Sequence, residues 1–71
     1  MPRQRYEEIA ADLRAKIESG EYPPGSQLPS RAELRELYTI SDTVADKAMM
    51  LLRVAGLVET LPGVGVFVAE R

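Results

Sequence analysis

The sequence predicts a small, mostly α-helical domain that ends in a β-hairpin, an α+β fold. Two observations carry this prediction. Apolar residues recur at helical spacing in three segments before residue 56, and two short β-type runs follow, separated by a glycine-rich turn. The 71 residues allow one small domain with a thin core. We therefore expect a single domain over residues 1–71, with three helices and a two-stranded hairpin.

The first helix is expected over about residues 5–19. Charged residues separate its apolar positions, which form one stripe: Tyr6, Ile9, Ala10, Leu13 and Ile17. Gly20 follows at a position where a helix often ends in the left-handed conformation.

The segment EYPPGSQ, residues 21–27, is expected to be a loop because two prolines and a glycine exclude regular structure. Pro24 and Gly25 suit the central positions of a type II turn. After this loop, Leu28 would return to the core as part of a very short strand, paired through a single hydrogen bond.

A second, short helix is expected over about residues 31–38. Ser30 and Glu33 form a capping box at its start. Arg31 and Arg35 share one face of this helix. Its apolar residues lie on another: Leu34, Leu37 and Tyr38.

A third helix is expected over about residues 42–55. Thr39 and Ile40 leave room only for a tight turn, and Ser41 then caps the helix, with Asp42 suited to the positive end of its dipole. Gly56 ends it. One face is apolar: Ala45, Ala48, Met49 and Leu52.

A β-hairpin, which we term the wing, is expected over about residues 57–69. Its β-type runs lie at 57–61 and 66–69 and are joined by PGVG at 62–65. Two helices joined by a short turn form a helix-turn-helix, and a hairpin directly after the second helix makes it winged. The predicted architecture is therefore a winged helix-turn-helix.

The stretch YEEIAADLRAKIESGEYPPGSQLPSRAELRELY resembles the N-terminal signature of GntR-type regulators, and ISDTVADKAMMLLRVAGLVETLPGVGVFV resembles their recognition helix and wing. The resemblance covers about residues 6–69. It implies a bacterial, cytoplasmic transcription regulator, most often a repressor, that binds a palindromic operator in double-stranded DNA as a homodimer. A small-molecule effector would bind a further C-terminal domain, which we expect to be absent here.

In a helix-turn-helix the second helix enters the major groove with its N-terminal residues at base edges. We therefore expect helix 42–55 in the major groove and the 62–65 wing at the adjacent groove or backbone. Lys47 can donate to guanine, Thr43 can reach a phosphate or a base, and a carboxylate can accept from cytosine N4. Arg53 and the Tyr38 hydroxyl could also contact phosphates. The candidate DNA-binding residues are Ser30, Arg31, Arg35, Ser41, Asp42, Thr43, Asp46, Lys47, Gly63 and Gly65.

Several of these positions depart from the family that the sequence resembles, in which arginines commonly stand at the positions of Asp42 and Asp46. Arg31 lies one place before the family's usual arginine, and Val64 replaces the usual basic residue between the wing glycines. Whether the two aspartates read bases or weaken DNA binding stays open.

Each candidate also has a structural alternative. Asp42 could serve only the helix dipole. Arg31 and Arg35 could balance Glu33 and Glu36 on a solvated face. The two wing glycines could serve only the geometry of the hairpin.

The composition argues against catalysis, a metal and a cofactor, since there is no Cys and no His and the domain is too small for a deep pocket. No apolar run approaches the roughly 20 residues of a membrane span, and the N-terminus lacks a secretory h-region.

The net charge of −2 motivates an alternative function, a winged-helix module that binds protein through an acidic recognition face. An apolar patch of Val44, Met50, Leu51 and Val54 would then surround the aspartates.

Overall fold

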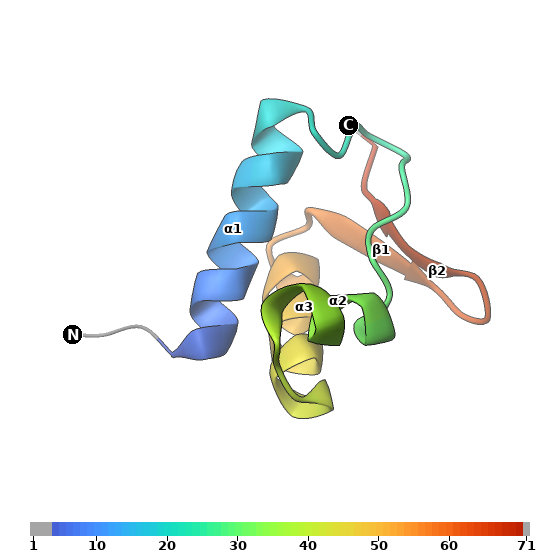
Figure 1. Cartoon of the computed structure of the whole chain (residues 1–71). Helices are drawn as coiled ribbons and strands as arrows, with labels where there is room; N and C mark the ends of the chain where they lie inside the picture. Colours follow the sequence, from blue (N-terminus) through green and yellow to red (C-terminus); the bar gives the residue numbers. More distant parts are fainter. Residues whose placement is uncertain (1–3, 71) are drawn as a thin grey trace.

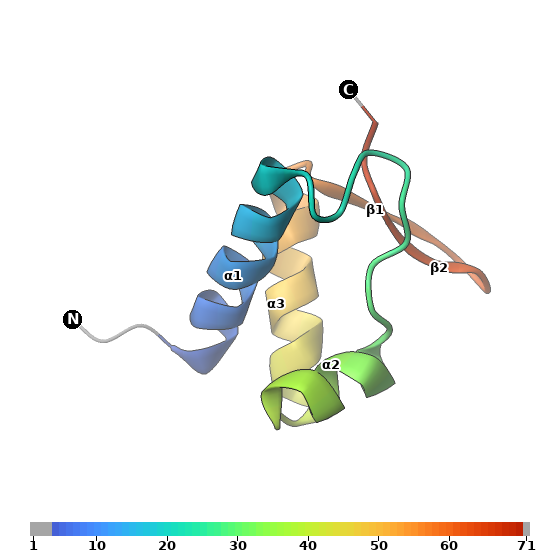
Figure 2. The ribbon, with the colours of Figure 1, turned by 45° about the horizontal axis from the view of Figure 1, so that its top comes forward.

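The computed structural model describes residues 4–70. Along the chain it contains α1 (Arg5–Ser19), α2 (Arg31–Tyr38), α3 (Asp42–Val54), β1 (Val58–Leu61) and β2 (Gly65–Val68). Figure 1 shows α1 on one side of α3 and the hairpin on the other, and Figure 2 shows α2 lying across the N-terminal end of α3. This arrangement confirms the predicted winged helix-turn-helix. The elements differ from the expected bounds by one residue at most: α3 ends one residue earlier, β1 starts one residue later, and β2 lies one residue earlier at both ends.

The helix ends follow the predicted caps. At the end of α1, Gly20 takes a φ of 90° and donates its N–H to the Ile17 carbonyl at 3.2 Å. At the start of α2, the Ser30 hydroxyl accepts from the Glu33 N–H at 3.2 Å, while the Glu33 carboxylate accepts from the Ser30 N–H at 3.0 Å. Local sequence therefore determines where these two helices begin and end.

The core lies between the three helices and the base of the hairpin, where α3 packs against both α1 and α2. Within residues 4–70 the buried side chains are all apolar: Ile9, Ala10, Leu13, Leu28, Leu34, Ala45, Ala48, Leu52, Leu57, Val58 and Val68. The apolar stripes predicted for the first and third helices supply most of them. So small a core makes each large member costly to truncate.

The loop after α1 joins the hairpin as a third, very short strand. Gly25 takes a φ of 83° in the predicted turn, and the Ser26 N–H donates to the Pro23 carbonyl at 3.0 Å. The Leu28 N–H then donates to the Val66 carbonyl at 2.8 Å. The isolated bridge lies at Gln27, next to the expected position. This pairing anchors β2 to the helical part of the domain.

Within residues 4–70, no helix combines the length and the apolar character needed to cross a membrane.

Candidate nucleic-acid interface

The helix-turn-helix is formed by α2, the turn at residues 39–41 and α3. Thr39 ends α2 in the left-handed conformation, with a φ of 54°, and the Ile40 N–H donates to the Arg35 carbonyl at 3.2 Å. The Ser41 hydroxyl then accepts from the Val44 N–H at 3.3 Å, which starts α3 as predicted. Because the turn is so short, α2 is held against the first turns of α3.

The outward face of α3 carries the residues that the sequence places toward DNA. Ala45, Ala48 and Leu52 are buried on the inward face. The side chains on the opposite face are exposed, as expected: Asp42, Thr43, Asp46, Lys47 and Met50. These five positions define what we term the reading face.

The apolar patch expected around the aspartates is only partly formed. Met50, Leu51 and Val54 are exposed, and Val54 keeps 82% of its surface. Val44 is instead half-buried and packs against the core, so its assignment to an exposed patch is wrong. Its position on the side of α3 that faces the core explains the difference.

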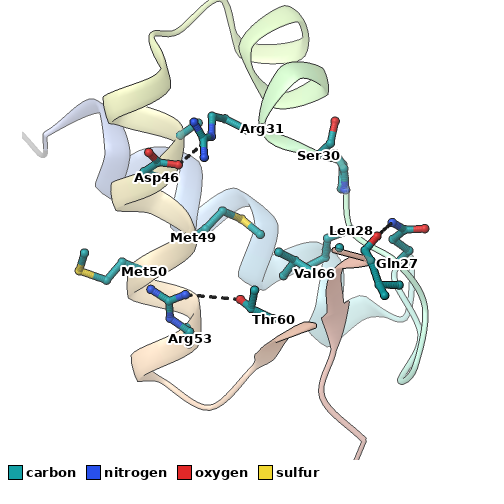
Figure 3. Close-up of a pocket in the computed structure, with 14 residues that line it drawn as sticks. Gln27, Leu28, Ser30, Arg31, Asp46, Met49, Met50, Arg53, Thr60 and Val66 are labelled. Carbon is teal, nitrogen blue, oxygen red and sulfur yellow. Dashed lines mark hydrogen bonds and ion pairs between the residues drawn. The ribbon is translucent and has the colours of Figure 1, made fainter. Parts of the chain in front are cut away.

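Both aspartates of the reading face form ion pairs with the arginines of α2. The Arg31 Nε lies 3.0 Å from Asp46 Oδ1, and the Arg35 Nε lies 2.9 Å from Asp42 Oδ1. Figure 3 shows the first pair bridging the two helices. The carboxylates beside these arginines thus come from α3 and not from Glu33 or Glu36, which was the alternative expected from the sequence.

These two pairs change the electrostatics of the interface. All four side chains remain about half exposed, so each pair stabilises the fold by at most about 1 kcal/mol. Their larger effect is on charge, because each arginine cancels an aspartate within the same face. The pairing therefore reduces both the predicted repulsion of phosphates and the charge available to attract them.

Lys47 lies toward α1. Its ammonium group is 5.4 Å from the centroid of the Tyr6 ring, a cation–π distance. The side chain is nevertheless exposed. Lys47 therefore supplies positive charge at the edge of the reading face.

Ser30 and Ser41 stand at the starts of α2 and α3. Each side-chain oxygen accepts a backbone N–H of its own helix. Each hydroxyl still has a proton to donate, and both residues are exposed. Both serines thus combine a structural cap with a position where helix N-termini favour anions.

A groove of about 450 Å³ separates α3 from the hairpin, next to the start of α2. Arg53 crosses one side of it and donates from Nη1 to the Thr60 hydroxyl at 3.4 Å. Among the described residues, no group of three or more His, Cys, Asp or Glu side chains could hold a metal ion. The groove is lined by apolar and polar side chains, among them Leu28, Ser30, Arg31, Asp46, Met49, Met50, Arg53, Thr60 and Val66.

Thr60 and Gln27 belong to this region but were not among the residues expected from the sequence. The Gln27 amide donates to the Val64 carbonyl at 3.4 Å and so covers the base of the wing tip. Strand alternation could have placed Thr60 on one face of the hairpin. Its contact with Arg53 depends on how α3 packs against the hairpin, which no local pattern encodes.

The wing turn uses both predicted glycines for backbone geometry. Gly63 has a φ of 76° and Gly65 a φ of 147°, and Leu61 pairs with Gly65 across the turn. Val64 at the tip is exposed. The tip of the wing is therefore a single small apolar side chain, Val64, between two glycines that have none.

Tyr38 has a structural position that excludes the expected phosphate contact. Its hydroxyl donates to the Asp12 carboxylate on α1, and the Lys16 ammonium lies 3.6 Å from Asp12 Oδ2. Burial and the Asp12 hydrogen bond raise the pKa of Tyr38 to about 12. The pKa of Lys16 is raised as well, chiefly by its electrostatic interaction with Tyr38. Tyr38 therefore links α1 to α2 and is not free for DNA.

Comparison with known proteins places this architecture in a family. The family described as "Bacterial regulatory proteins, gntR family" matches residues 5–68. The chain is 39% identical over 70 residues to the Exu regulon transcriptional regulator of Escherichia coli K12, covering 99% of this chain and 27% of that protein. It is 38% identical over 69 residues to the Histidine utilization repressor of Klebsiella aerogenes, covering 97% and 29% of the two chains. The chain thus spans little more than a quarter of these relatives.

Solved structures agree with the sequence comparison. The DNA-binding domain of AraR, in complex with an operator, is 26% identical and superposes with a TM-score of 0.92 over 97% of this chain and 83% of that one. A GntR family transcriptional regulator from Listeria monocytogenes is 25% identical, with a TM-score of 0.92 over 97% and 60% of the two chains. The resemblance seen in the sequence is confirmed: the chain belongs to the GntR family of bacterial regulatory proteins.

Proposed function

We propose that this chain is the DNA-binding domain of a bacterial transcription regulator and binds operator sites in double-stranded DNA. The observation that carries the proposal is the close superposition of α2, α3 and the hairpin on a domain solved with its operator. In this mode α3 enters the major groove and the 62–65 wing contacts the adjacent groove or backbone. A chain with this role acts in the bacterial cytoplasm, where the chromosome lies.

The described residues offer enough phosphate contacts for this role despite the net charge of −2. Positive charge comes from Lys47 on the reading face and from Arg53 further along α3, and neither has a carboxylate partner among residues 4–70. The starts of α2 and α3 add backbone N–H groups and the hydroxyls of Ser30 and Ser41. Because these contacts are few, one domain should bind weakly and two should bind a palindromic operator together.

The protein most consistent with this domain is a repressor that works as a homodimer on DNA. One similar protein is named a repressor, and the other is named a transcriptional regulator. A small-molecule effector would require residues outside this chain, as the greater length of the relatives suggests.

The rival function, binding of a basic protein to an acidic face, is less well supported by the geometry. Its motive was the exposed charge of Asp42 and Asp46, and Arg35 and Arg31 cancel that charge. What remains of the expected patch is the exposed surface of Met50, Leu51 and Val54. Nothing in their arrangement indicates a basic partner.

The proposal is tested by titrating the chain with the DNA upstream of its own coding region, beside a scrambled duplex, at two salt concentrations. We expect saturable binding that favours the upstream DNA and weakens with salt. Lys47→Gln should lower the affinity for both duplexes, because it removes a phosphate contact.

Arg14→Gln is the matched control, since Arg14 is an exposed cation on α1 that is paired with Glu18 at 3.5 Å. It should leave binding unchanged. Absence of binding to either duplex at low salt would contradict the proposed function.

A further inference from the structure

The reading face carries two carboxylates that are arranged as a pair of acceptors. Asp42 and Asp46 are one helical turn apart on α3, and both side chains are more than half exposed. Only one oxygen of each, Oδ1, lies at the arginine Nε. An ionised carboxylate has about four lone-pair sites and no donor. Each aspartate therefore keeps acceptor capacity toward whatever faces α3.

The arginines make this placement compatible with DNA. A bare carboxylate close to a phosphate backbone would be repelled, whereas a carboxylate and a guanidinium 2.9 or 3.0 Å apart form a pair with little net charge. Arg31 and Arg35 lie on α2, the helix that crosses the DNA backbone in this motif. Their remaining N–H groups, up to four on each, can face phosphates while Nε holds the aspartate. They are positioning residues for Asp46 and Asp42.

An acceptor in the major groove can be satisfied only by a base amino group, which is N4 of cytosine or N6 of adenine. The adenine amino group lies between two acceptors, adenine N7 and thymine O4, which would both repel a carboxylate. The cytosine amino group has only guanine O6 on one side, with a carbon-bound hydrogen on the other. Cytosine is therefore the better partner for an aspartate.

We infer that Asp42 and Asp46, each held by an arginine of α2, are specificity-determining residues that select cytosine in the operator half-site. The inference rests on the proposed function and adds to it the bases that are read. Four residues of helix rise span about 6 Å, close to two base-pair steps of about 3.4 Å. The two selected C·G pairs should thus lie about two positions apart.

The test selects bound duplexes from a library with randomised positions and compares the chain with Asp42→Asn and Asp46→Asn variants. The unchanged chain should enrich two C·G pairs at the stated spacing. Each variant should lose cytosine preference about tenfold at one position only and gain adenine there, since an asparagine amide pairs with adenine N6 and N7. Asp46→Ala should lose cytosine without gaining adenine. A merely structural role would not produce this switch.

The matched control is Glu18→Gln, which removes one negative charge from an exposed ion pair on α1. It should select the same sites as the unchanged chain, and circular dichroism should show that all variants are folded. If the aspartate variants select the same sites as the unchanged chain, the inference is overturned while the proposed function stands. If the unchanged chain selects no sequence, both are overturned.

Discussion

Arg35 of α2 and Asp42 of α3 face each other across the helix-turn-helix, with 2.9 Å between Nε and Oδ1. Arg31 and Asp46 repeat the relationship at 3.0 Å, one turn earlier on α2 and one turn later on α3. The charge of two arginines on the helix that crosses the DNA backbone is thereby largely cancelled by carboxylates of the same domain. Non-specific DNA binding should be weak as a result, which suits a domain that must find specific sites among many others.

Releasing these arginines should strengthen binding to random DNA. In the double variant Asp42→Asn/Asp46→Asn, we expect higher affinity for a duplex of scrambled sequence. The plot of log K against log salt should steepen by about 0.9 for each arginine that gains a phosphate. Fluorescence anisotropy across a salt series measures both quantities. Glu18→Gln is the control, and a slope equal to that of the unchanged chain would show that the arginines stay where they are.

Local patterns predicted the fold almost completely, because each element has its own signal. The Ser30–Glu33 box starts α2, Gly20 ends α1, and apolar spacing identifies the inward face of α3. The candidate site was harder to predict. The sequence identified Asp42 and Asp46 as unusual but could not pair them with Arg35 and Arg31, since that contact depends on the crossing of α2 and α3. The Tyr38 hydroxyl was misassigned for the same reason, because its partner Asp12 lies 26 positions away on another helix.

Because the core is thin, we expect two leucines of α2 to differ greatly in how much each contributes to the free energy of unfolding. Leu34 is fully buried, with 0% of its surface exposed, whereas Leu37 keeps 66%. Leu34→Ala should lower the free energy of unfolding by about 2–5 kcal/mol, a large part of the stability of so small a domain. Leu37→Ala should change it by less than about 0.5 kcal/mol. Urea unfolding followed by circular dichroism compares them, and similar losses at both sites would contradict the packing described.

Gly65 should be intolerant of a side chain because of its backbone. Its φ of 147° lies where residues with a Cβ are strained, and an added Cβ would come 2.5 Å from Gln27 Nε2. We expect Gly65→Ala to destabilise the domain by about 1–3 kcal/mol. Val64→Ala, at the exposed tip, should have little effect.

The two causes at Gly65 can be separated in a Gln27→Ala background. The contact with the amide is then gone and the φ strain remains. If Gly65→Ala costs nothing in that background, the cost comes from the clash and the backbone is relaxed.

The contact between Tyr38 and Asp12 predicts a loss of stability in alkaline solution. The pKa of Tyr38 is about 12 in the folded state and close to its ordinary value of 10 in the unfolded chain. Because folding favours the protonated phenol, this contribution is fully present below pH 10. It is lost as the pH rises from 10 through about 12.

The Tyr38→Phe variant provides the comparison for this pH effect, since it lacks the titrating group and keeps the ring. The excess stability of the unchanged chain over the variant should be constant up to pH 10 and should then decline. The chain has three tyrosines, and in the folded protein the tyrosinate absorbance of Tyr38 should appear near pH 12 instead of near its ordinary pKa of 10. The Tyr38→Phe variant should lack this step. If Tyr38 ionises near pH 10, its hydroxyl is not held by Asp12, and the link between α1 and α2 must rest on other contacts, such as the donation from Arg5 Nη2 to the Tyr38 carbonyl at 3.0 Å.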